Sequence, residues 1–225
     1  MSSLKRFFSN VVNQDMTKVV NTAGKLSPLE FESHLSVSRY GKFVLTEAVR
    51  PSFDLKVVPS EGYRHDRYSD ENTGASIPVL MISVSAEKIF DVFLDLLQPL
   101  GGTVDAVLES SHLRKIPGHK DVRREQIDLP VLTSYLFDYE HLFLADGCVG
   151  IAVLNPAIPA EVQWDEHKLI TVYADNLKPY EKVLRKYNIP HRQDIRLISE
   201  AEHVHITRKE YAGQFNALKT LICAE

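Results

Sequence analysis

Two stretches of the chain read almost alike: ISVSAEKI at Ile82–Ile89 and ITVYADNL at Ile170–Leu177. Each begins with alternating β-branched residues, which favour a buried strand, and each continues into a predicted helix. Both helices end at a proline, and another strand is predicted after each of them. Because the surrounding pattern has the same order, α-β-β-α-β, we predict a tandem duplication in which Ile82 and Ile170 occupy equivalent central strands.

The repeat divides the chain into four predicted segments. They are an N-terminal extension at 1–26, a first unit at 27–113, a basic connector at 114–127, and a second unit with a closing helix at 128–225. Short neighbouring strands mixed with β-α-β units predict an α+β fold with mixed or antiparallel sheets layered with helices. A capping box at Ser27–Glu30 predicts the first helix, and a second at Thr207–Glu210 predicts the C-terminal helix.

Apolar residues at helical or alternating spacing predict the core. The cleanest helical stripe runs through Leu132, Tyr135, Leu136 and Tyr139, and a second one contains Leu177, Tyr180 and Leu184. We expect these side chains to pack beside the predicted buried strand residues Ile82, Val84, Ile151, Val153, Ile170 and Val172.

The composition excludes several classes of protein. With 225 residues, 44% hydrophobic and 25% charged, the chain has the balance of an ordinary globular protein. The 30 acidic residues outnumber the 26 basic ones, so we expect no nucleic-acid binding. No apolar run approaches the ~18 residues of a membrane span, and the N-terminus lacks a secretory apolar core. We therefore expect a cytoplasmic protein that does not bind membranes.

Familiar cofactor and disulfide signatures are also missing from the sequence. Two cysteines exclude a disulfide framework, and we expect Cys148 to be a small buried core residue. No GxGxxG follows a predicted strand, and GxxxxGK[ST] does not occur, which argues against dinucleotide and P-loop nucleotide sites. We therefore expect no cofactor.

The sharpest chemical motif is His203-Val204-His205. On a strand, residues i and i+2 point to the same face, so two imidazoles can converge on one metal ion, with Glu210 as a third ligand. This spacing resembles the metal motif of cupins, but Glu210 falls in a predicted helix cap and no glycine-flanked hairpins surround the motif. Glu200, Glu202 and His112 are alternative ligands. With only two ligands placed locally, we expect a partly exposed strand face without a tightly bound metal.

Two further clusters combine acids with histidine: Asp165-Glu166-His167 and Asp138-Tyr139-Glu140-His141. Neighbouring residues on a strand face opposite sides, so Glu166 and His167 are not expected to form one site. Asp138 and His141 are three residues apart on a predicted helix and can pair on its surface. We interpret both clusters as solvated surface.

Two polar segments are candidates for partner binding. A predicted loop of about 17 residues carries Tyr63, Arg64, Arg67 and Tyr68, and loops of that length are uncommon unless they are functional or disordered. The basic connector contributes Arg123 and Arg124. If the two segments flank one groove, a protein or a small acidic ligand is the expected partner.

Two functional hypotheses follow. The first is a non-catalytic binding or regulatory module, with a homodimer as one alternative form, because no catalytic motif is complete. The second is a metal-dependent hydrolase or oxygenase centred on His203 and His205, in which the metal activates water and Glu200 or Glu210 acts as base.

Overall fold

A seven-stranded sheet forms the centre of the molecule in the computed structural model, which describes residues 26–69, 74, 76–112 and 122–223. All neighbouring strands in it are antiparallel. Their spatial order is β4 (Gly62–Ser69), β5 (Ser76–Ser83), β10 (Ile170–Ala174), β9 (Ala160–Trp164), β8 (Val149–Asn155), β6 (Thr103–Ser110) and β7 (Val122–Asp128).

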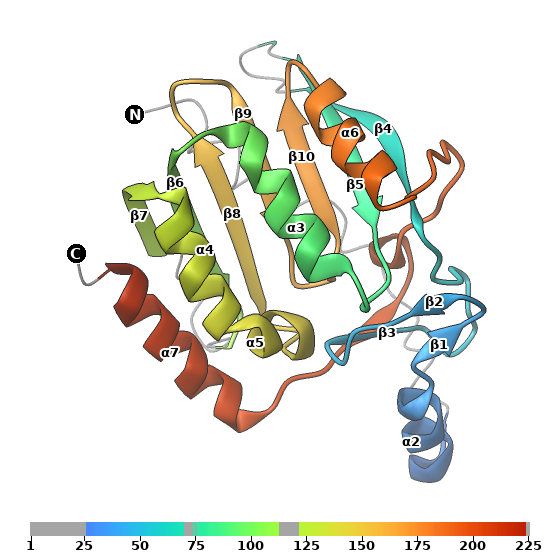
Figure 1. The fold of residues 1–225 in the computed structure, drawn as a ribbon. Coiled ribbons are helices and arrows are strands. Elements are labelled where there is room, and N and C mark those ends of the chain that lie inside the picture. Colours follow the sequence, from blue (N-terminus) through green and yellow to red (C-terminus); the bar gives the residue numbers. More distant parts are fainter. Residues whose placement is uncertain (1–25, 70–73, 75, 113–121, 224–225) are drawn as a thin grey trace.

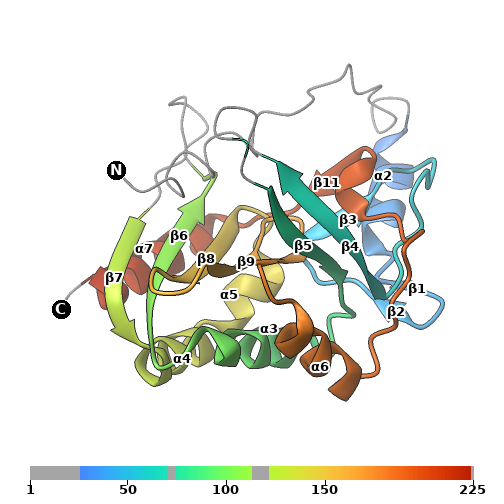
Figure 2. The same ribbon diagram turned by 90° about the horizontal axis from the view of Figure 1, so that it is seen from above.

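Helices cover one face of this sheet. Figures 1 and 2 show α3 (Ile89–Leu97), α4 (Leu129–Asp138) and α6 (Lys178–Lys186) lying side by side on that face. The short α5 (Glu140–Ala145) follows α4, and the C-terminal α7 (Lys209–Cys223) runs along the β7 edge in contact with α4. The α+β class with a C-terminal helix is therefore as predicted. Within the described residues, no helix is both long and apolar enough to cross a bilayer.

Two small antiparallel sheets lie at one end of the large one. The first pairs β1 (Arg39–Tyr40) with β2 (Phe43–Val44), and the second pairs β3 (Val49–Pro51) with β11 (His203–His205). Strands β1, β2 and β3 come directly after α2 (Pro28–Ser36) in the chain. The predicted capping box of this helix is present: Ser27 Oγ accepts from the Glu30 amide, and the Glu30 carboxylate accepts from the Ser27 amide. The 3-10 turn η3 (Ile198–Glu200) leads into β11.

The main core lies between the large sheet and its helices. In α3, seven of the nine residues are buried, and the 3-10 turn η2 (Gln98–Leu100) that follows buries Leu100. Trp164 is 1% exposed and packs against Phe93 and Phe143. The predicted core residues are buried, except that Tyr135 and Tyr139 are half-buried at its margin.

The structure does not confirm the predicted duplication. The first matched stretch begins at the end of β5 and the second at the start of β10, and these strands are direct antiparallel neighbours with Ile82 opposite Ile170. Each is followed by a helix on the same face of the sheet. Beyond the helices the correspondence ends, because β6 joins the large sheet whereas the chain after α6 continues to the separate β3–β11 sheet. Strands from both predicted units belong to one sheet, in which β10, β9 and β8 of the second unit lie between β5 and β6 of the first, so the units are not spatially separate.

Several local expectations were wrong. The predicted loop at 60–76 contains β4, an edge strand whose polar residues look like a loop because only one neighbour pairs with it. The predicted connector contains β7, which is the opposite edge strand. The alternating pattern of residues 53–58 predicts a strand, but this segment forms a turn and a bend, and Leu55 has a φ of 48°. The apolar residues at 195–199 also predict a strand, but the chain enters η3 at Ile198.

Candidate metal centre

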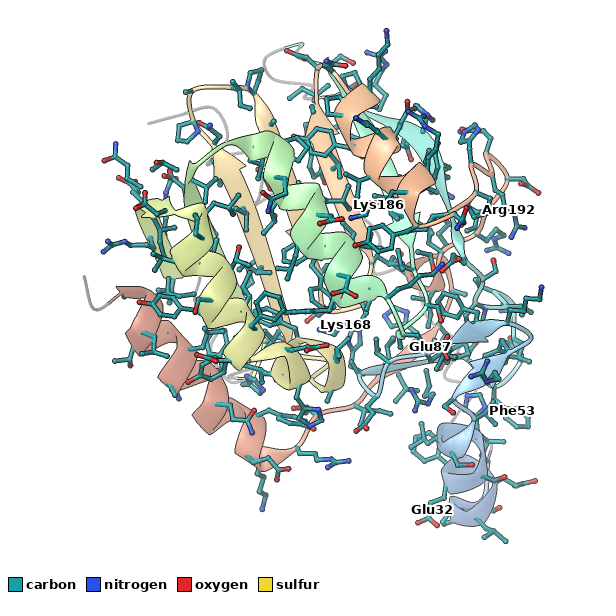
Figure 3. All side chains as sticks on the ribbon, viewed as in Figure 1. Glu32, Phe53, Glu87, Lys168, Lys186 and Arg192 are labelled. Carbon is teal, nitrogen blue, oxygen red and sulfur yellow. The ribbon has the colours of Figure 1, made fainter. Side chains whose placement is uncertain are left out.

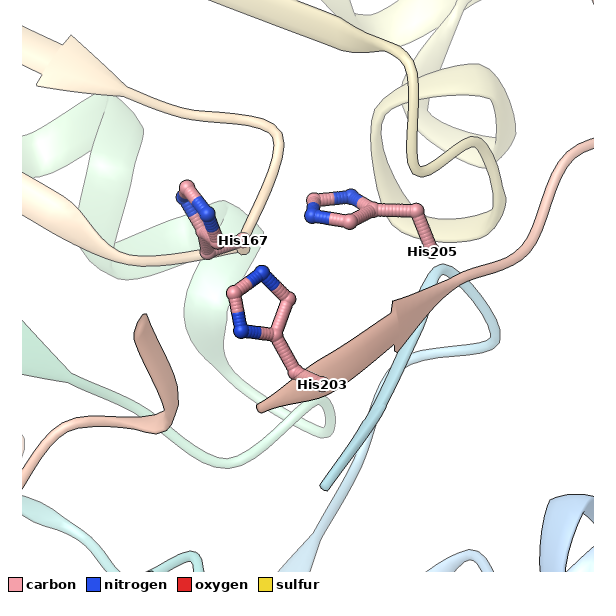
Figure 4. Close-up of side chains that lie close together, drawn as sticks. All are labelled: His167, His203 and His205. Carbon is pink, nitrogen blue, oxygen red and sulfur yellow. The ribbon is translucent and has the colours of Figure 1, made fainter. Parts of the chain in front are cut away.

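Three histidine rings converge beside the β3–β11 sheet. His203 and His205 project from β11, and His167 comes from the turn between β9 and β10 (Figure 4). The ring centroids are 4.7 Å apart for His167–His203 and 4.9 Å apart for each of the other two pairs. Their donor atoms all lie within 4.8 Å of one another. This near-equilateral arrangement brings His167 together with two histidines that lie 36 and 38 positions further along the chain.

The β9–β10 turn holds His167 in place. Its Asp165 amide donates to the Leu169 carbonyl, and Asp165 Oδ1 accepts from the Leu169 amide at 2.9 Å. Lys168 adopts a φ of 61°, a conformation that is uncommon for residues other than glycine. His167 therefore lies in a tight turn, whereas the sequence argument that separated it from Glu166 assumed a strand.

Each ring is anchored through Nδ1. His203 Nδ1 donates to the Ala201 carbonyl at 2.8 Å, and His205 Nδ1 donates to the Gly147 carbonyl at 2.7 Å. His167 Nδ1 lies 3.0 Å from Asp165 Oδ2. A carbonyl oxygen only accepts, so Nδ1 carries the proton in His203 and His205, and Nε2 of each neutral ring keeps a lone pair. This is the outer-shell pattern of metal-ligating histidines.

The protonation states suit metal binding. Burial lowers the pKa of His203, and burial together with the neighbouring His167 lowers the pKa of His205 to about 4. Burial opposes the charged form of His167 as well, but Asp165 outweighs it and raises the pKa of His167. At neutral pH, two of the three rings are therefore neutral ligands, and a cation at the centre of the group would displace the proton from the third.

Charged groups and a pocket surround the rings. Glu166 interacts electrostatically with all three of them and accepts a hydrogen bond from Ser111 Oγ at 2.9 Å. Lys168 lies inside the molecule (Figure 3), where its Nζ donates to the Val149 carbonyl and burial lowers its pKa to about 8. A small pocket of about 20 Å³, partly open to solvent, reaches His167 and Lys168. Its lining includes the apolar side chains of Phe43, Leu45, Val49, Val84, Leu169 and Ile198.

The structure brings together only part of the predicted ligand set. His203 and His205 share one face of β11 and are both half-buried, as expected. Glu210 lies apart from the group in the first turn of α7, where its exposed carboxylate is 3.9 Å from Arg208. Sequence reasoning missed His167, and the available signal was its place in an acidic turn, Asp165-Glu166-His167, between two apolar strands.

The residues predicted to bind a partner lie at opposite edges of the sheet. Tyr63 belongs to the core, and Arg64 pairs with Glu200 at 2.5 Å. Arg67 donates to Ser76 on the neighbouring strand, and the Tyr68 ring contacts that of Tyr173. Arg123 pairs with Asp105 at 2.5 Å on the β7 side. Because β4 and β7 are the two outermost strands, these residues do not flank one groove.

Parts of three predicted segments lie outside the described residues. These parts are 70–73 and 75 of the predicted loop, 114–121 of the basic connector, and 1–25 of the N-terminal extension. On β7, Arg124 is partly exposed, and its Nε is buried without a hydrogen-bond partner in the described part of the chain.

Comparison with family models, with curated proteins and with solved structures finds no match to this chain. The function is therefore argued from the geometry of the site.

Proposed function

We propose that His167, His203 and His205 bind one divalent transition-metal ion and that the protein is a metal-dependent hydrolase. The observation that carries the proposal is the convergence of three imidazoles whose Nδ1 atoms are all engaged by fixed partners. A chance surface group of histidines does not need such anchoring, whereas a metal site does, because the ring orientation sets the direction of the Nε2 lone pair.

Zinc is the metal that this ligand set favours. Imidazole suits zinc, and three protein ligands leave a fourth position open, which distinguishes catalytic zinc sites from structural ones. When bound there, zinc lowers the pKa of a coordinated water so that hydroxide is available near neutral pH.

The surrounding residues supply the other requirements of hydrolysis. Glu166 is the candidate general base, because its carboxylate acts on all three rings and Ser111 holds it. The pocket that reaches His167 has room for little more than one water molecule, so it is a candidate position for water and not for the substrate.

This proposal replaces the non-catalytic binding module as the leading hypothesis. That hypothesis rested on the lack of a complete ligand set, and His167 supplies the ligand that the sequence did not reveal. The partner-binding residues that would have supported it are distributed over two distant sheet edges.

The test is the metal content and the hydrolytic activity of the purified protein. We expect zinc bound in wild type and metal-dependent hydrolysis within a panel of chromogenic esters, phosphoesters and amides. His167→Ala and His203→Ala should each lose this zinc and this activity, whereas His191→Ala, which removes an exposed histidine on another segment, should keep both. Failure of wild type to bind metal after reconstitution would refute the proposal, and bound iron in place of zinc would favour an oxygenase.

A further inference from the structure

A second group of ligand-type side chains lies beside the three histidines. His112 follows the end of β6, while Asp146 and Cys148 belong to the turn between α5 and β8. Their donor atoms all lie within 4.8 Å of one another. Asp146 is fully buried, and Cys148 is 7% exposed. None of the three is part of the centre described above.

Hydrogen bonds orient two of these side chains, those of His112 and Asp146. His112 Nδ1 is 2.6 Å from Ser110 Oγ, so the other ring nitrogen, Nε2, faces Asp146. The Cys148 amide donates to Asp146 Oδ1 at 3.2 Å, which leaves Oδ2 facing His112. The pattern matches that of the three histidines, where the atom away from the centre is engaged and the atom toward it is not.

The two facing atoms are buried and unsatisfied. His112 Nε2 and Asp146 Oδ2 are 2.8 Å apart, yet neither makes a hydrogen bond of acceptable alignment within the described part of the chain. Buried polar atoms are nearly always partnered, so this pair requires an explanation. In a tetrahedral site, two ligands at about 2.0–2.2 Å from one ion lie roughly 3.3–3.6 Å apart, so these two atoms would separate by about 0.5–0.8 Å to take an ion between them.

We propose that His112, Asp146 and Cys148 bind a second metal ion, with zinc as the preferred one. A thiolate, an imidazole and a carboxylate are the three ligand types that zinc takes in proteins. Two of them are anionic when bound and neutralise the charge of the ion. Lys168 interacts electrostatically with both Asp146 and Cys148.

The second site also supports the first, because the two share the peptide at Gly147. The Gly147 carbonyl accepts from His205 Nδ1, and its amide donates to the Ile206 carbonyl at 2.8 Å. An ion bound by Asp146 and Cys148, the residues on either side of Gly147, fixes the position of the Gly147 carbonyl. The His205 ring that donates to this carbonyl is then fixed as well. Loss of an outer-shell contact commonly costs 10–100-fold in metal affinity. We expect a loss of that size at the three-histidine centre when the second site is empty.

The test uses cobalt as a spectroscopic substitute for zinc in the Cys223→Ser chain. Cys148 and Cys223 are the only cysteines, and Cys223 is exposed at the end of α7, so Cys148 is the sole thiol in this variant. A thiolate-to-cobalt charge-transfer band in the near ultraviolet must then come from Cys148. We expect this band, together with two zinc ions per chain in the zinc-loaded protein.

Further variants separate this proposal from the three-histidine one. Adding His203→Ala to Cys223→Ser should remove one zinc and keep the thiolate band. Adding Cys148→Ser or Asp146→Asn should remove the other zinc, and Cys148→Ser should also abolish the band. One zinc per chain with no thiolate band in Cys223→Ser would overturn the second site and leave the first intact. Because that readout keeps Cys148 in place, it does not depend on whether the Cys148→Ser chain folds.

Discussion

His205 has a ring that stays neutral well below the pH at which free imidazole is protonated. Its pKa is lowered from 6.5 to about 4, whereas in the unfolded chain it returns to about 6.5. Between these values the unfolded chain binds a proton that the folded chain does not. The free energy of unfolding of the metal-free protein therefore falls as the pH drops from about 6.5 toward 4, by up to ~1.4 kcal/mol per pH unit for this group.

We predict that His205→Gln flattens this pH dependence. The measurement is urea unfolding at a series of pH values with a chelator present, and His191→Gln is the control. His167 contributes with the opposite sign, because its pKa is raised and its stabilisation is lost as the pH rises, but it is unchanged in both variants. If His205→Gln keeps the wild-type slope, the ring is already protonated in the folded protein.

Gly147 is required for steric reasons. A Cβ atom there would lie 2.4 Å from the Ala48 carbonyl oxygen and 3.0 Å from backbone atoms of Ile206, and backbone cannot move aside as a flexible side chain can. We predict that Gly147→Ala destabilises the protein by about 1–3 kcal/mol and weakens metal binding by displacing the carbonyl that orients His205.

The matched control for this prediction is Gly213→Ala in α7. A Cβ at Gly213 meets nothing within 4 Å, and alanine is a better helix former than glycine. Gly213→Ala should therefore stabilise the protein by about 0.5–1 kcal/mol in the same denaturant melts. Equal effects of the two substitutions would contradict the close approach at Gly147.

At the scale of the element, α4 shows that apolar spacing predicts which face of a helix is buried but not where the helix ends. Its stripe predicted the inward face, and Leu132 and Leu136 are fully buried. The same stripe did not predict that the helix ends at Asp138 and that α5 begins at Glu140. The apolar spacing continues through Tyr139 into Leu142 and Phe143. It therefore gives no sign that the helix is interrupted at Tyr139.

We predict that Leu136→Ala costs about 2–5 kcal/mol of stability, because it leaves a cavity between α4 and the sheet. Val131→Ala on the same helix, at a side chain that is 37% exposed, should cost less than about 1 kcal/mol. Chemical denaturation of both variants measures the difference. A loss below ~1 kcal/mol at Leu136 would mean that the helix does not pack as described.

At the scale of the whole molecule, an ion at the three histidines links two sheets. His167 belongs to a turn of the seven-stranded sheet, and His203 and His205 belong to the β3–β11 pair. Because the unfolded chain does not hold these residues together, zinc should stabilise the folded state by about 4 kcal/mol at a free concentration of 1,000 Kd.

We predict a rise in melting temperature on addition of zinc, reversed by a chelator. The His191→Ala variant should show the full shift, and His167→Ala should lose the part that belongs to this centre. Calorimetry or a thermal shift assay at fixed protein concentration measures it. Equal shifts in the two variants would place the stabilising ion elsewhere.

The sequence by itself determined the local features of this protein. The spacing of apolar residues and the helix-capping residues predicted the α+β class, the buried strands at Ile82 and Ile170, and the helix stripes at Leu136 and Leu184. These features are readable because an element that buries one face has apolar residues at the period of that element. The pair His203 and His205 was readable for the same reason, since strand geometry alone puts positions i and i+2 on one face.

Only the tertiary structure decided which strands pair with one another and which distant residues come into contact. Strand order is set by pairing between segments far apart in the chain, so β5 lies beside β10, and β4 and β7 become opposite edges. The third histidine reaches the pair through the β9–β10 turn, and His112 reaches Asp146 across 34 residues. Such contacts leave no period in the sequence, because each depends on a single residue whose partner is brought close by the folding of the rest of the chain.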